Sequence, residues 1–202
     1  MGSFLIIFDI QIHTYIVMKR IIALTLVAGL IIVGSCKKLK SVADIKFQVP
    51  YKETAEVPGL PNNPFIPAEG LTVSLPAIEV ESQSEEYLKQ YNTSSEFIRE
   101  VRTTDLRLTI EQPASQNFDI VDSLWLLVSA TGRPEILAAH KYGIPKGQNV
   151  VNLDLVDNDM KEYFLADKMY FRLIGHFYDA PDTTTKLNFF VNFEIVANPL
   201  YK

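Results

Sequence analysis

The stretch MYFRLIGHFYDAPDTTTKLNFFVNFEIVA, residues 169–197, decides the fold class of this chain. It contains two runs in which apolar and polar side chains alternate, separated by a short segment, residues 180–183, that is rich in turn-forming residues. Alternation with a period of two places every second side chain on the same face of a β-strand. We therefore expect two long strands joined as a hairpin, each with one face turned toward a hydrophobic core.

Similar runs recur along the chain after residue 44. We expect further extended segments at 45–51, 73–80 with a bend at Pro76, 106–110, 123–131, 136–142 and 151–155. Short helices are expected at 84–91, with an extension to Val101 as an alternative, and at 157–166. About eight short strands separated by turns predict a mainly β fold, an immunoglobulin-like antiparallel β-sandwich with one or two short helices, formed by residues 44–202 as a single domain.

Two of these segments carry more specific expectations. The run at 123–131 is almost continuously apolar, which predicts a central strand buried on both faces with Trp125 in the core. Pro50 indicates that the first segment lies at the edge of a sheet, because proline cannot donate a ladder hydrogen bond.

Prolines recur at every third residue in the loop at 58–70, at Pro58, Pro61, Pro64 and Pro67. This spacing favours the polyproline II conformation, which has three residues per turn. We interpret the loop as a stiff connection that crosses from one sheet to the other. A ligand for an aromatic groove is the alternative.

Composition limits the classes of function. The chain has 202 residues, of which 48% are hydrophobic, and a formal net charge of −5. This is typical of a folded domain and too apolar for a disordered chain. The absence of a basic block argues against nucleic acid as a partner. The single cysteine, Cys36, excludes an internal disulfide.

The N-terminal part has the order of a secretory signal. Two basic residues follow Met18, residues 21–33 are apolar or small except for one threonine, and Val33-Gly34-Ser35-Cys36 closes the run. A charged start, an apolar run and a small-residue end are typical of a signal peptide. As a helix the apolar run would cover roughly 20 Å, which is too short for a permanent membrane span.

The four closing residues resemble the lipobox of bacterial lipoproteins, and the chain is similar in style to small envelope lipoproteins of Bacteroidota. The resemblance implies a signal peptide at 18–35, cleavage between Ser35 and Cys36, a diacylglycerol thioether on Cys36 and acylation of the new amino group. Several acyl chains hold a protein firmly on a membrane, whereas one chain alone is marginal. Residues 36–43 would be the lipidated cysteine and a short tether.

Other interpretations of the N-terminal part stay open. Residues 1–17 fit an upstream mis-start with Met18 as the true start, and a long signal anchor that begins at Met1 is the alternative. Cys36 could instead be a buried free thiol, or the apolar run a core helix. The polar sequence Lys37-Lys38-Leu39-Lys40 directly after the cysteine argues against both.

No catalytic motif occurs in the sequence: there is no nucleophile elbow, zinc-protease helix, phosphate loop or dinucleotide fingerprint. We therefore expect no catalytic residues and no cofactor. Asp154, Asp157 and Asp159 are weak candidates for calcium or for a metal-assisted hydrolase. The favoured interpretation of Asp157 is the N-cap of the helix that follows. His176 is expected as a polar residue on a strand face.

Tyrosines supply the weak candidates for ligand binding. Tyr87 and Tyr91 are four residues apart on the first expected helix, and Tyr170 and Tyr178 lie on one expected strand. Exposed aromatic rings form flat platforms on which sugars stack, whereas buried rings serve packing. An exposed row of rings would favour a glycan ligand.

Two functions follow as hypotheses. The first is a lipid-anchored cell-envelope protein whose sandwich has a non-enzymatic binding or structural role, with the membrane as partner through Cys36 and an envelope protein as a second partner. The alternative is a surface glycan-binding lipoprotein of a polysaccharide uptake system. By analogy with other lipoproteins, Lys37 and the absence of an acidic stretch after Cys36 indicate the outer membrane, facing the periplasm.

Overall fold

The computed structural model describes residues 44–60 and 66–200. The predicted signal peptide, the lipidation site at Cys36 and the prolines Pro61 and Pro64 lie outside the described residues. From Ile45 onward the chain forms one compact unit.

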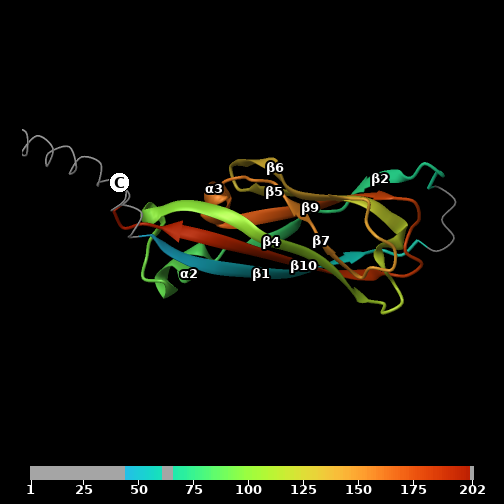
Figure 1. Cartoon of the computed structure of the whole chain (residues 1–202), viewed down its shortest axis with the longest axis horizontal. Coiled ribbons are helices and arrows are strands. Elements are labelled where there is room, and N and C mark those ends of the chain that lie inside the picture. Colours follow the sequence, from blue (N-terminus) through green and yellow to red (C-terminus); the bar gives the residue numbers. More distant parts are fainter. Residues whose placement is uncertain (1–43, 61–65, 201–202) are drawn as a thin grey trace, which may run out of the picture. The chain divides into compact units, whose positions relative to one another are not determined.

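Two antiparallel sheets pack face to face in this unit (Figure 1). Sheet A has the strand order β1-β10-β4-β7, formed by β1 (Ile45–Val57), β10 (Thr185–Ala197), β4 (Ile98–Gln112) and β7 (Val150–Asn152). Sheet B has the order β2-β9-β5-β6-β8, formed by β2 (Leu71–Ser74), β9 (Lys168–Phe177), β5 (Val121–Ala130), β6 (Arg133–Tyr142) and β8 (Asp154–Leu155). β3 (Ile78–Glu81) also pairs with β9. The predicted mainly β sandwich is confirmed.

The described residues form ten strands instead of eight, because two expected segments are divided. Pro76 separates β2 from β3, and both pair with β9. The segment at 151–155 contributes β7 to sheet A and β8 to sheet B. Between them Leu153 is buried and its amide donates to the carbonyl of Leu106 at 2.9 Å. The chain therefore changes sheets within one short run.

The predicted hairpin at 169–197 is wrong. β9 lies in sheet B beside β5, and β10 lies in sheet A between β1 and β4. The segment that joins them crosses from one sheet to the other, so the apolar faces of the two strands meet across the core. The loop after β1 also crosses from sheet A to sheet B, as expected. β1 is an edge strand, which agrees with the prediction from Pro50.

The helices are shorter than their predicted spans. α2 (Ser84–Gln90) matches its segment. The alternative extension to Val101 is wrong, because β4 begins at Ile98 and both Ile98 and Val101 are fully buried in the core. α3 (Lys161–Phe164) is a single turn within the predicted 157–166.

The core lies between the inward faces of the two sheets. Along each strand, core residues alternate with residues that point outward, as the sequence pattern predicts. Phe193 of β10 is fully buried at the centre, with its ring centroid 5.7 Å from that of Tyr51 and 6.4 Å from that of Phe164. The side chains on the two outward faces are the ones available to a ligand.

Candidate functional site

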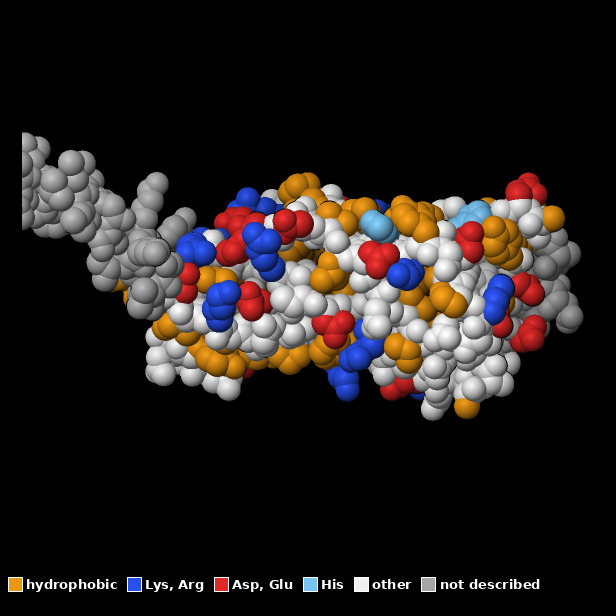
Figure 2. Space-filling view, viewed as in Figure 1, with side chains coloured by type: hydrophobic (Ala, Val, Ile, Leu, Met, Phe, Trp, Pro, Cys, Tyr) orange, Lys and Arg blue, Asp and Glu red, His pale blue; other side chains and the backbone are white. Residues whose placement is uncertain are grey.

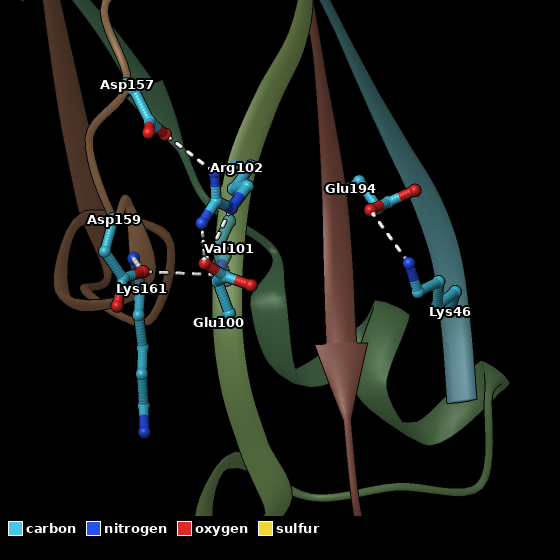
Figure 3. Close-up of polar contacts among 8 residues, drawn as sticks. All are labelled: Lys46, Glu100, Val101, Arg102, Asp157, Asp159, Lys161 and Glu194. Carbon is cyan, nitrogen blue, oxygen red and sulfur yellow. Dashed lines mark hydrogen bonds and ion pairs between the residues drawn. The ribbon is translucent and has the colours of Figure 1, made fainter. Parts of the chain in front are cut away.

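The outward face of sheet A carries many polar side chains that bind one another, beside the ring of Phe190. Asn192 Nδ2 donates to Gln48 Oε1 at 2.8 Å, and the hydroxyl of Thr104 donates to the same oxygen at 3.2 Å. Lys46 and Glu194 form an ion pair across β1 and β10 at 3.7 Å (Figure 3). The polar groups of this face are therefore largely satisfied by their neighbours.

Part of the outward face of sheet B is aromatic. It carries Trp125 on β5, His140 and Tyr142 on β6, His176 on β9, and Tyr178 directly after β9. We call these five residues the aromatic face. Figure 2 shows histidine side chains among hydrophobic ones along the side of the molecule formed by these strands.

Strand register brings these residues together. Trp125 is paired with His140 on one side and with Ile174 on the other. Ser123 is paired with Tyr142 and with His176. Because paired residues of antiparallel strands point to the same face, two neighbouring rows place aromatic rings side by side.

The prediction that Trp125 lies in the core is wrong. Its strand β5 is a central strand of sheet B, as expected, but it is not buried on both faces. Leu124 and Leu126 point inward and are buried, so the alternation of the strand turns Trp125 outward, where it is half-buried. The apolar run conceals this alternation, because residues on both faces of β5 are apolar.

Trp125, His140 and Tyr142 form one ring cluster. The rings of Trp125 and Tyr142 meet edge to face, with centroids 5.7 Å apart and an interplanar angle of 75°. The indole Nε1 of Trp125 donates to the Tyr142 hydroxyl at 3.1 Å. The His140 ring lies 4.9 Å from that of Tyr142. Tyr142 is thus held in place although 57% of its surface is exposed.

His176 and Tyr178 form a second ring cluster, with perpendicular rings 5.3 Å apart. The Tyr178 hydroxyl donates to Asp122 Oδ2 at 3.1 Å, and this hydrogen bond raises the pKa of Tyr178. His176 is fixed through both ring nitrogens, which lie 3.0 Å from the Thr72 hydroxyl and 3.0 Å from the carbonyl oxygen of Glu69. His176 is therefore a cross-strand polar residue, as expected.

Gly70 allows the loop before β2 to approach His176. It has a φ of +86°, and a Cβ at this position would lie 2.4 Å from His176 Nε2. Only glycine combines this backbone conformation with such a close approach. The loop thus supports the second ring cluster from the side of β2.

Buried polar atoms without partners lie beside both clusters. The register of β5 against β9 shifts between Val121 and Ser123, which leaves Asp122 as the extra residue of a bulge. Bulges re-aim side chains and are frequent next to functional sites. Among the described residues, Asp122 Oδ1 and His140 Nδ1 are buried side-chain atoms without a hydrogen-bond partner. Such atoms are rare in folded proteins.

The tyrosines predicted from the sequence do not form one site. Tyr87 and Tyr91 pack α2 onto β1: Tyr91 stacks on Phe47 at 4.1 Å, and Tyr87 meets Tyr51 edge to face at 6.2 Å. Tyr170 is paired with Glu79 and Ser129, toward the end of β9 opposite Tyr178. Of the four, only Tyr178 belongs to the aromatic face.

The three aspartates are engaged separately. Asp154 forms an ion pair with Lys141 at 3.1 Å, and Asp157 with Arg102 at 2.7 Å. The prediction that Asp157 caps a helix is wrong, because Met160 occupies the N-cap position.

Asp159 accepts from the amides of Lys161 at 3.0 Å and Val101 at 3.2 Å, which ties its loop to β4 (Figure 3). In the described part of the chain, no group of three or more His, Cys, Asp or Glu residues could hold a metal ion.

Sequence reasoning missed Trp125, His140 and Tyr142 as site residues. A signal was present in β5, where Ser123 and Ser129 share a face with Trp125 and mark that face as outward. The sequence alone does not show that His140 and Tyr142 of β6 lie beside Trp125, because this depends on the register between β5 and β6.

Within residues 44–60 and 66–200, no helix is long and apolar enough to cross a membrane. No protein-family model matches the chain, and no curated protein matches it.

Among solved structures, the chain is similar to the decameric BFDV capsid protein, with 7% identity over 76% of this chain and 99% of that chain, at a TM-score of 0.36. Turnip yellow mosaic virus matches with 13% identity over 78% and 98% of the two chains, at a TM-score of 0.25. Desmodium yellow mottle tymovirus matches with 11% identity over 78% and 91%, at a TM-score of 0.23. Likeness at these TM-scores says nothing about what this protein does.

Proposed function

We propose that this protein is a lipid-anchored cell-envelope protein whose β-sandwich is a non-enzymatic binding module, with the aromatic face as its ligand-binding surface. The observation that carries the binding role is the difference between the two outward faces. Many polar side chains of sheet A bind one another, whereas sheet B presents the exposed rings of Tyr142 and Tyr178 beside two buried polar atoms without a partner.

Exposed aromatic side chains support binding for a physical reason. Tyrosine and tryptophan bring a large apolar surface together with a polar tip, and both are enriched where proteins bind ligands. The rings of this face are already fixed by hydrogen bonds and ring contacts. A ligand therefore immobilises few side chains when it binds, which lowers the entropic cost of association.

The anchor is proposed from the sequence around Cys36. Its likeness to a lipobox supports lipidation, and the residues that follow support an outer-membrane position facing the periplasm.

Site-specific photo-crosslinking in cells tests the binding face. We would place p-benzoylphenylalanine at Tyr142 and, in a matched control, at Phe190, which points outward from sheet A beneath Arg107. A benzophenone inserts into nearby C–H bonds and captures proteins and glycans alike. We expect a crosslinked product from position 142 and none from position 190. Equal products at both positions, or none at position 142, would contradict the proposal.

A further inference from the structure

We infer that the aromatic face binds a neutral carbohydrate chain, with Tyr142 and Tyr178 as two stacking platforms. This inference rests on the proposed function and names its ligand. The residues involved come from β5, β6 and the end of β9, and these residues match no known binding motif.

Tyr142 and Tyr178 have the rings that a ligand can reach. They are 57% and 46% exposed, and each is braced by a less exposed ring, Trp125 for Tyr142 and His176 for Tyr178. A pyranose ring has a face of C–H groups and an edge of hydroxyls. An aromatic ring with a polar tip complements both, because its face packs against the C–H groups while nearby polar atoms meet the hydroxyls.

The spacing of the two clusters favours a chain of sugars over a single one. Ser123 of β5 lies between Tyr142 of β6 and His176 of β9 in one row. The backbones of the outer two strands are therefore two strand spacings apart, about 10 Å. Ser123 is small and buried, so it does not rise between the rings. A ligand in contact with both clusters must be longer than one pyranose ring.

Charge favours a neutral ligand. Arg172 is ion-paired with Glu135, and Lys141 with Asp154, so these cations of sheet B are already neutralised. The chain as a whole has a formal charge of −5, which repels polyanions. The polar atoms left without a partner beside the rings are Asp122 Oδ1, which is an acceptor, and His140 Nδ1, which donates or accepts according to the tautomer of the ring.

Isothermal titration of the full chain in detergent tests the inference. The probes are neutral polysaccharides (an α-glucan, a β-glucan, a mannan and a galactan) and two polyanions, heparin and polygalacturonate. We expect binding to at least one neutral polysaccharide and to neither polyanion. Tyr142→Ala and Tyr178→Ala should each lower the affinity about tenfold, the loss typical of one removed aromatic contact.

Two variants serve as controls. Tyr142→Phe keeps the ring and should keep most of the affinity. Tyr91→Ala removes a tyrosine that is 36% exposed on the C-terminal side of α2 and should bind like the natural protein. Thermal melts of all variants exclude misfolding as the cause of a loss.

Three outcomes would overturn the inference: no neutral polysaccharide binds, the two alanine variants bind normally, or Tyr91→Ala loses as much affinity as they do. Crosslinking at position 142 shows whether only the carbohydrate inference is wrong or the proposed binding face as well. If position 142 captures a protein in cells while no polysaccharide binds, the ligand class is wrong and the binding face stands. If position 142 captures nothing and no polysaccharide binds, both the ligand class and the binding face are wrong.

Discussion

Replacing Phe193 with alanine should destabilise the protein more than truncating an outward side chain of the same strand. The Phe193 ring is fully buried between the sheets and contacts Tyr51 and Phe164. Removing a fully buried phenylalanine costs about 3–5 kcal/mol, because burial is lost and a cavity remains. For a domain of this size, that corresponds to a fall in melting temperature of about 10 °C.

Phe190→Ala is the matched control, three residues earlier on β10. Its ring points outward, half-buried beneath Arg107, whose guanidinium carbon lies 4.9 Å from the ring centroid. We expect a loss of about 1 kcal/mol, the size of an exposed cation–π contact. Urea unfolding followed by far-ultraviolet circular dichroism measures both variants. Equal losses, or a larger loss for Phe190→Ala, would refute the assignment of the inward and outward faces.

Three further predictions follow from single contacts or motifs. Burial, and to a lesser extent the neighbouring Tyr87, raise the pKa of Tyr51 in the folded state. In the unfolded chain the Tyr51 hydroxyl has a pKa of about 10. The free energy of unfolding should therefore fall as the pH rises above about 10, because only the unfolded chain then loses the proton. This fall should be smaller in Tyr51→Phe, as measured by urea unfolding between pH 8 and pH 11; identical pH profiles would argue against burial of the hydroxyl. Cys36→Ala should move the protein to the soluble fraction or leave an uncleaved precursor, and unchanged fractionation and mass would refute the anchor. Because Asp157 is ion-paired with Arg102 and Asp159 accepts from two backbone amides, millimolar Ca²⁺ or EDTA should leave the melting temperature unchanged, whereas a rise of several degrees with Ca²⁺ would reveal a cation site.

The alternation of apolar and polar residues was sufficient to predict the strands and the sandwich, because it reports the local geometry of each strand. It could not predict which strands pair. The runs at 169–177 and 185–197 are adjacent in sequence and equally amphipathic, yet they lie in different sheets. β9 pairs with β2, β3 and β5, whereas β10 pairs with β1 and β4. These partners are distant in the chain and are selected by packing of the whole core.

The residues of the candidate site could likewise be predicted only in part from the sequence. Tyr178 was a sequence candidate because it alternates with Phe177 on a recognisable strand. A large apolar residue in an apolar run predicts burial of Trp125. The inward orientation of Leu124 and Leu126 instead turns it outward. The bulge at Asp122 has no sequence signature, since it arises from a register shift between two strands.

If ligand binds on the outward face of sheet B, the indole signal of Trp125 should report it. Trp125 is the single tryptophan of the chain, and its Nε1–H is hydrogen-bonded to the Tyr142 hydroxyl. In a ¹⁵N-labelled sample, that resonance should move when a bound polysaccharide is titrated, while the amides of β1 and β10 stay in place. An unchanged indole resonance, together with shifts confined to β1 and β10, would contradict binding on the outward face of sheet B.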